Sequence, residues 1–253
     1  MNDIAIQAND IAFAYGERSV LGGVSFSIPR GEIWALVGRS GVGKTTLLQI
    51  IAGLFRPTKG NVYVGGRDNL NPGRIRGIVF QEDALLGWLT VIENTLFPNH
   101  KNPSAERRKA GLEALKSVGL AQRSSSYPNQ LSAGMRKRLE FARALLADDE
   151  YILADEPFGT VDALTRRELW HLWGQLRERQ PRTGILCTHD PEEAVRLCDA
   201  VVVLQRGEPA NAADPLRIPT ELRLVPVDHE DSRISGLKEQ ILTSLNGGYG
   251  EPS

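Results

Sequence analysis

The stretch Gly38-Arg-Ser-Gly-Val-Gly-Lys-Thr45 decides the fold, because it fits the pattern G-x-x-x-x-G-K-[ST] at every fixed position. Its glycines let the backbone wrap so that several N–H groups point inward at phosphate oxygens. Lys44 adds a positive charge near the β and γ phosphates, and the Thr45 hydroxyl can ligate Mg²⁺. An accidental glycine-rich turn is the alternative. The apolar run Ile33–Val37 before the loop and the helical segment Lys44–Ile51 after it favour a phosphate-binding loop.

The loop predicts a nucleoside triphosphate as ligand rather than a dinucleotide, since the Rossmann pattern G-x-G-x-x-G does not occur in it. The residues expected to bind the nucleotide from this loop are Gly38, Arg39, Ser40, Gly41, Val42, Gly43, Lys44, Thr45 and Thr46.

Four short apolar runs are typical of buried parallel strands, and helical patterns alternate with them. They are Ile33–Val37, Ile78–Phe80, Ile152–Ala154 and Ile185–Cys187. Each run ends at or within two residues of a polar group that could do chemistry, namely the loop at Gly38, Gln81, the pair Asp155–Glu156, and His189. Ligands of open α/β sheets bind beyond the carboxyl ends of the strands. The sequence therefore predicts an α/β fold with one shared site.

Two carboxylates follow the apolar run Tyr151–Ala154. Asp155 is expected to hold Mg²⁺ through water. Successive side chains of a strand point to opposite faces, so Glu156 is free to orient and deprotonate an attacking water. A solvated Asp-Glu pair at the start of a loop is the alternative, and the phosphate loop elsewhere in the chain argues against it.

The middle of the chain, roughly residues 81–146, indicates a helical insertion into the sheet domain. One expected helix runs over residues 132–146, with an apolar face. After Arg206 the pattern weakens, and a further helix is expected near residues 235–245.

Composition argues against several other classes of protein. The chain has 253 residues, a formal net charge of −1 and two cysteines. It has no overall positive field to attract DNA or RNA, so no nucleic-acid partner is expected. Two thiols are too few for a disulfide scaffold, which indicates a reducing compartment. No signal peptide is expected in Met1–Asp10, and no apolar run approaches the ~20 residues that span a bilayer.

Two further motifs are found near the acidic pair. Leu131-Ser-Ala-Gly-Met135 precedes it, and Asp155-Glu-Pro-Phe-Gly-Thr-Val-Asp162 continues from it. With Tyr15, the phosphate loop, Gln81 and His189 in the same order over nearly the whole chain, the sequence resembles the ATP-binding subunits of ABC transporters. Finer detail is similar to the nitrate, sulfonate and taurine importer group, in residues 76–88, 134–138, 162–166 and 188–194.

The resemblance implies an α/β fold of the P-loop NTPase (RecA-like) class. Such a fold has a mainly parallel sheet core, an N-terminal antiparallel β part and an inserted helical subdomain, here at about residues 82–147. The ATPase domain would span residues 1–206, and residues 207–253 would be a short C-terminal extension. The implied cofactors are ATP and Mg²⁺, and the implied reaction is ATP hydrolysis coupled to solute import.

The resemblance also implies roles for single residues. Tyr15 would stack on adenine, Gln81 would sense the γ-phosphate and Mg²⁺, and His189 would contact the γ-phosphate. Asp155 would serve the metal, and Glu156 the attacking water. The catalytic set is then Glu156, His189 and Gln81, and the metal set is Thr45, Gln81 and Asp155.

Other matching residues imply a partner subunit. Ser132, Ala133 and Gly134 would form the signature that reaches ATP held by the other subunit, and Asp162 would lie at the interface. Two ATP molecules would be sandwiched in a head-to-tail dimer with a second copy or a related ATPase subunit. Integral-membrane permease subunits and, indirectly, an external solute-binding protein are the further expected partners. The expected location is cytoplasmic, at the inner face of the membrane through the permease.

Simpler structural roles stay open for several residues. Three could be ordinary strand-end or structural residues: Tyr15, Gln81 and His189. Ser132 is a natural helix N-cap, which does not exclude an anion site at the same helix start. The side chains of the run Arg136–Arg138 either form a solvated basic face or face an approaching triphosphate. Trp88 is either a core residue or an aromatic contact near the groove that receives a permease helix.

Ala133 departs from the family, whose signature has a glycine there, and its methyl group could restrict the backbone. The sequence predicts normal ATP binding and retained, slower hydrolysis. Rival functions are an ABC-type module that binds ATP with weak or no turnover, a soluble ABC ATPase of DNA repair or translation, and the ATPase subunit of an exporter.

Overall fold

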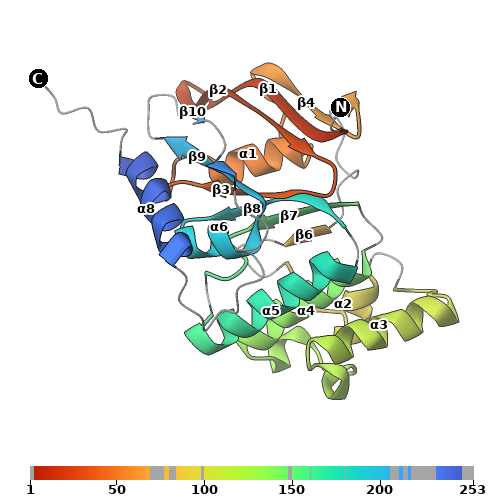
Figure 1. Cartoon of the computed structure of the whole chain (residues 1–253). Helices are drawn as coiled ribbons and strands as arrows, with labels where there is room; N and C mark the ends of the chain where they lie inside the picture. The colour runs from red at the N-terminus through yellow and green to blue at the C-terminus, as the bar shows by residue number, and fades with distance from the viewer. Residues whose placement is uncertain are drawn as a thin grey trace, which may run out of the picture. The chain divides into compact units, whose positions relative to one another are not determined.

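The computed structural model describes residues 3–68, 77–79, 84–97, 100–147, 150–159, 161–179, 181–205, 211–212, 216–217 and 232–246. The chain forms two compact units, residues 1–75 with 181–253, and residues 76–180 (Figure 1). The phosphate loop and His189 belong to the first unit, and the acidic pair and the signature segment belong to the second. Within the described residues, no helix is both long and apolar enough to cross a membrane.

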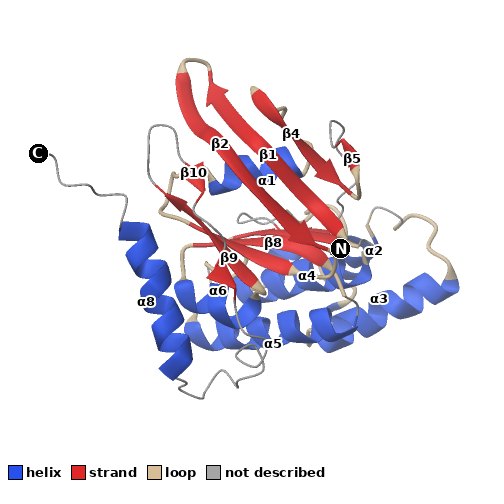
Figure 2. Ribbon diagram, turned by 45° about the horizontal axis from the view of Figure 1, so that its top comes forward, coloured by secondary structure: helices blue, strands red, loops and turns tan. Residues whose placement is uncertain are grey.

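The N-terminal part of the first unit is an antiparallel sheet with the strand order β2-β1-β4-β5 (Figure 2). Its strands are β1 (Ile4–Tyr15), β2 (Arg18–Pro29), β4 (Lys59–Val64) and β5 (Arg67–Asp68). Because β1 pairs with both β2 and β4, it lies inside the sheet and ends at Tyr15. The antiparallel β part implied by the family resemblance is confirmed.

A parallel sheet in the same unit has β3 (Ile33–Val37) between β8 (Thr183–Thr188) and β9 (Ala200–Gln205). Every residue of β3 and β8 is buried, which explains why their sequences are largely uninterrupted apolar runs. Short strands β10 (Asn211–Ala212) and β11 (Leu216–Arg217) pair with β9 in the antiparallel sense. Among the described residues of this unit the helices are α1 (Lys44–Ile51), α6 (Pro191–Leu197) and α8 (Ser232–Asn246).

The second unit contains the parallel pair β6 (Gly77–Val79) and β7 (Tyr151–Asp155). Its helices are α2 (Val91–Leu96), α3 (Ala105–Ser117), α4 (Ala133–Leu146) and α5 (Ala163–Arg179), with single turns η1 (Ala121–Arg123) and η2 (Pro128–Gln130). Helix α4 packs against α2, α3 and α5 (Figure 2). This central helix therefore connects the helical layers of the unit.

An aromatic cluster fixes the segment that follows β7. The ring centroids of Phe141 on α4 and Phe158 lie 5.7 Å apart, and each lies 6.2 Å from the ring of Trp173 on α5. All three side chains are buried. Phe158 comes three residues after Asp155, so the cluster anchors the loop after the acidic pair to two helices.

The strands expected from the apolar runs are confirmed, with Ile33–Val37 found at the expected bounds as β3. The runs at 152–154 and 185–187 lie inside β7 and β8, and Ile78 lies in β6, whereas Phe80 is outside the described residues. The helix expected near residues 235–245 begins earlier, at Ser232. The domain boundaries and the extent of the helical subdomain stay predictions.

The expectation of a solvated basic face at Arg136–Arg138 is wrong for its middle residue. Lys137 is 1% exposed, and its Nζ lies 3.0 Å from Oε2 of Glu140, one turn further along α4. The side chain of Arg138 pairs with Glu168 of α5, and Arg136 donates to the carbonyl of Leu131 at 2.8 Å. All three cations therefore make polar contacts within the second unit, and the buried Lys137 is paired with an equally buried carboxylate.

Candidate nucleotide-binding site

The phosphate loop joins β3 to α1 and is shaped by glycine at two positions. Gly43 has a φ of 108°, a left-handed value that side chains with a Cβ rarely adopt. A Cβ on Gly43 would also lie 2.9 Å from Cδ2 of Leu21, and a Cβ on Gly38 would lie 2.6 Å from Cγ1 of Val42. The backbone is thus folded so tightly against itself and β2 that larger residues would clash.

The Lys44 side chain is held inside this loop. It is 5% exposed, and its Nζ donates to the carbonyls of Gly38 at 2.8 Å and Arg39 at 3.3 Å. A buried ammonium group requires such partners, because removing it from water is otherwise costly. The loop therefore carries a fixed positive charge, for which a phosphate group is a natural counter-ion.

The start of α1 adds partial positive charge at the same place. Its first turn reads Lys44-Thr-Thr-Leu47, so it contains no acidic side chain to offset the helix dipole. Arg39, Ser40 and Gly41 are exposed, as is Thr45, whereas Thr46 is buried. Free N–H groups at a helix start bind anions. The geometry of the predicted phosphate loop is therefore that of an anion site.

His189 leaves the parallel sheet beside the phosphate loop. In the register of β3 and β8, Val37 lies opposite Thr188. Gly38 and His189 are the next residues of these two parallel strands, so both emerge at the same carboxyl edge. His189 is exposed there, and the turn after it is fixed by Asp190, whose carboxylate caps α6 by accepting from Glu192 N at 2.8 Å.

Tyr15 ends β1 and is 50% exposed. Its hydroxyl lies 3.4 Å from the hydroxyl of Thr46, in the first turn of α1. The first unit thus brings together three of the predicted elements of the site, namely the phosphate loop, Tyr15 and His189.

In the second unit, β7 ends in the acidic pair. Asp155 is 4% exposed, and Glu156 is partly exposed with a φ of 43°. This left-handed conformation costs a residue with a Cβ about 1–2 kcal/mol. Strain of this kind is typical of functional sites, where a side chain is aimed at a defined point. The strand therefore stops at Asp155 and the backbone turns sharply at Glu156.

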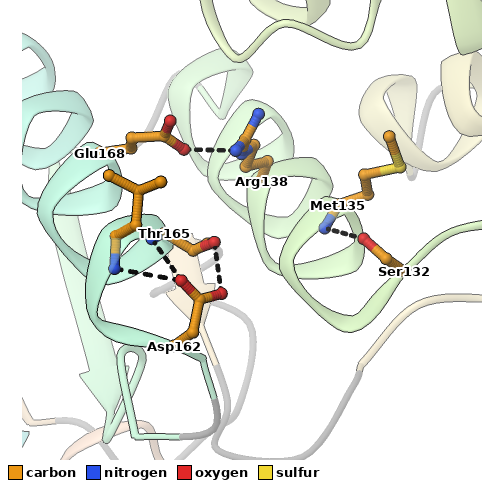
Figure 3. Close-up of polar contacts among 7 residues, drawn as sticks. Ser132, Met135, Arg138, Asp162, Thr165 and Glu168 are labelled. Atoms are coloured by element: carbon orange, nitrogen blue, oxygen red, sulfur yellow. Dashed lines mark hydrogen bonds and ion pairs between the residues drawn. The ribbon is translucent and has the colours of Figure 1, made fainter.

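The signature segment forms the beginning of α4. Ser132 is the N-cap, and its hydroxyl accepts from Met135 N at 3.3 Å (Figure 3). Ala133 is the first helical residue and is exposed. A Cβ on Gly134 would lie 3.0 Å from Cγ2 of Thr165, so glycine there lets α4 approach α5. The N-cap interpretation of Ser132 is confirmed, and the anion-binding role of this helix start stays a prediction.

Asp162 caps the start of α5 in the same region (Figure 3). Its carboxylate accepts from Leu164 N at 3.1 Å, from Thr165 N at 3.0 Å and from the Thr165 hydroxyl at 2.7 Å. The hydrogen bonds from the Thr165 backbone and hydroxyl lower the pKa of Asp162 below its ordinary value. This capping role was not predicted from the sequence. An aspartate just before a helix is nevertheless a familiar cap, because its carboxylate can accept from the backbone amides two and three residues further along.

A buried polar network, also missed from the sequence, ties α4 to the segment before α2. Oε1 of Glu140 accepts from Ala84 N at 2.8 Å, and Arg143 donates to Ala84 O at 2.8 Å. Burial raises the pKa of Glu140, although Lys137 opposes the effect. Both backbone polar groups of Ala84 are therefore held by α4 side chains, three residues after Gln81. Gln81 itself lies outside the described residues.

Trp88 is 75% exposed, so the core interpretation of this residue is wrong. It lies in the turn just before α2, whose N-cap is Thr90. The other interpretation, an aromatic contact near the groove that receives a permease helix, stays a prediction.

Comparison with known proteins identifies the class of protein. The family model described as ABC transporter matches residues 21–159. The aliphatic sulfonates import ATP-binding protein SsuB 2 of Rhizobium johnstonii is 37% identical over 95% of this chain and 91% of its own length. The corresponding protein SsuB of Pseudomonas fluorescens is 36% identical over 100% of this chain and 90% of its own length. A dimeric ATP-binding cassette in a post-hydrolysis state, bound to ADP and Pi, is 31% identical with a TM-score of 0.74, covering 85% of this chain and 99% of that one.

The α/β fold and the glycine-wrapped lysine define a P-loop protein that binds ATP. Family model, relatives and structural neighbours then make the assignment specific. The chain belongs to the ABC transporter family, and within it the chain is an ATP-binding subunit and an ATPase.

Proposed function

We propose that this chain energises an importer for aliphatic sulfonates or a similar small solute such as taurine or nitrate. The observation that carries the proposal is the match over nearly the whole length to relatives named as aliphatic sulfonate import ATP-binding proteins. The complete phosphate loop, with its buried Lys44, supports retention of the ATP-driven step.

ATP binds with its phosphates in the loop of residues 38–46 and its adenine on the ring of Tyr15. Lys44, the loop amides and the α1 dipole neutralise the triphosphate. Mg²⁺ would be held by Thr45, Gln81 and Asp155, whose hydroxyl, amide and carboxylate oxygens are of the type that this ion prefers. The ion's chemistry is to neutralise charge that develops on the phosphate oxygens.

Hydrolysis proceeds by in-line attack of water on the γ-phosphorus. Glu156 orients and deprotonates the water, and His189 and Gln81 contact the γ-phosphate side of the reaction. The partner cassette contributes its signature residues Ser132, Ala133 and Gly134, whose capped helix start faces the γ-phosphate. Catalysis then consists mainly of positioning and charge stabilisation.

The partners are a second cassette, identical or related, and integral-membrane permease subunits, with an external solute-binding protein acting through the permease. Asp162 lies at the cassette interface. The exposed ring of Trp88 supports a permease contact next to α2. The chain works at the inner face of the membrane, where the permease holds it.

Growth of the source organism tests the solute. A strain lacking this gene should fail to grow with an aliphatic sulfonate as the sole sulfur source and should grow normally on sulfate. Wild-type chain should restore growth, whereas Lys44→Ala should not, because it loses the charge that binds the triphosphate. Normal growth of the deletion strain on sulfonates would overturn the assigned solute and leave the ATPase assignment untouched.

A second candidate, a module that binds ATP with weak turnover, is favoured by Ala133 alone. Ala133 is exposed at the first position of helix α4. The alanine therefore fits the local backbone, and its effect is expected on turnover rather than on ATP binding.

A further inference from the structure

Three aromatic rings form a platform at the end of β1, beside the phosphate loop. Phe13 and Tyr15 are two residues apart on one strand, so their side chains share a face. Phe55 joins them from the turn that follows α1. In this turn the backbone N–H groups of Leu54 and Phe55 both donate to the carbonyl of Gln49. The platform therefore combines a strand end with the end of the phosphate-loop helix.

The rings are arranged in the geometry that aromatic side chains prefer. Phe13 and Phe55 are stacked, with centroids 5.6 Å apart and planes 5° apart. Tyr15 stands edge-on to both, at 4.9 Å and 85° from Phe13 and at 6.0 Å and 86° from Phe55. Edge-to-face pairs of this kind are favourable beyond the area that they bury. A half-exposed tyrosine is thereby held in one orientation.

A third contact ties the platform to the phosphate loop. The Tyr15 hydroxyl lies 3.4 Å from the hydroxyl of Thr46, which belongs to the first turn of α1. Phe55 is attached at the other end of the same helix. Because α1 is one continuous helix between these two contacts, it sets the spacing between the phosphate-binding turn and the aromatic platform.

We propose that Phe13 and Phe55 are positioning residues for the nucleotide base, which hold the Tyr15 ring ready to stack on a purine whose phosphates lie in the loop. The inference rests on the proposed role of Tyr15. A ring that is already ordered loses less side-chain freedom when a base stacks on it, so the two phenylalanines raise the affinity without contacting the phosphates. Their effect is therefore confined to ligands that carry a base.

Calorimetric titration of the full chain with Mg·ATP and with inorganic tripolyphosphate separates this role from a structural one. Phe55→Leu should weaken ATP binding about 2- to 10-fold, the cost of ordering one side chain. Tripolyphosphate, which has no base, should bind as it does to wild type. The separate variant Phe55→Tyr keeps an aromatic ring and should bind ATP as tightly as wild type does. Phe26→Leu, the same change in β2 beside Trp34, is the control for general loss of packing and should leave both affinities unchanged.

Two results would overturn the proposal. One is unchanged ATP affinity in Phe55→Leu while Tyr15→Ala binds ATP about 10-fold more weakly, as loss of a stacking ring predicts. The other is an equal loss of ATP and tripolyphosphate affinity, which would show a structural role only. If instead Tyr15→Ala binds ATP like wild type, the proposed base site itself is wrong.

Discussion

Ala133 stands between the N-cap Ser132 and Gly134, and its methyl group is exposed at the first position of α4. Alanine favours helix over glycine by up to about 1 kcal/mol, so it stiffens the turn that carries the signature. In the proposed mechanism this turn meets the γ-phosphate of ATP held by the partner cassette, and a stiffer turn adapts less well to it. We therefore expect Ala133→Gly to raise kcat about 2- to 5-fold, the equivalent of about 0.5–1 kcal/mol in the barrier.

Steady-state phosphate release by the purified cassette measures this effect, and ATP affinity should stay within twofold of wild type by calorimetry. Ala147→Gly, at the other end of the same helix, is the matched control, because it makes the same change far from the signature. Lower turnover in Ala133→Gly than in wild type would mean that the alanine assists catalysis.

Helix α4 as an element depends on the buried pair Lys137–Glu140, whose side chains are 1% and 0% exposed. Removing one member of a buried ion pair costs about 3–5 kcal/mol, and Arg143, which also lowers the pKa of Glu140, keeps the loss toward the lower end of that range. Lys137→Met should therefore lower the free energy of unfolding by about that amount in urea denaturation at neutral pH. The double variant Lys137→Met, Glu140→Gln should recover most of the loss, because glutamine can still accept from Ala84 N.

The pH dependence of the Lys137→Met variant follows from the same pair. Burial raises the pKa of folded Glu140 above its ordinary value, and Lys137 holds that rise down. Without Lys137 the folded pKa rises further, so the folded state takes up a proton more readily than the unfolded state. The free energy of unfolding lost in Lys137→Met is therefore largest at a pH above the folded pKa of Glu140. The loss becomes smaller as the pH falls through that folded pKa toward the ordinary value of 4.5.

The elements that could be predicted from the sequence are those specified locally. β3 and α1 have the expected bounds because the loop between them requires a strand before and a helix after. The burial of Lys137 could not be predicted, since a run of three cations looks solvated until its partner Glu140 is seen to be buried too. The aromatic platform of Phe13, Tyr15 and Phe55 was not predicted for a similar reason, because Phe55 reaches it from another element.

The whole molecule works, by the proposed mechanism, as a pair of cassettes that close on ATP and reopen after hydrolysis. Glu156→Gln removes the base and keeps the nucleotide site, so turnover should fall at least about 100-fold. With Mg·ATP, size-exclusion chromatography should show this variant at about twice the mass of the 27.8 kDa chain, because the closed pair no longer reopens.

Glu113→Gln, an exposed change on α3, is the control and should turn over and elute like wild type. Adding Ser132→Arg to Glu156→Gln tests how the pair is held. If the signature of one cassette binds the ATP of the other, the added side chain blocks that contact, and the double variant should bind ATP yet elute as a single chain. A double variant that still pairs would show that the cassettes meet through another surface, and the head-to-tail arrangement would have to be given up even if Glu156 is the base.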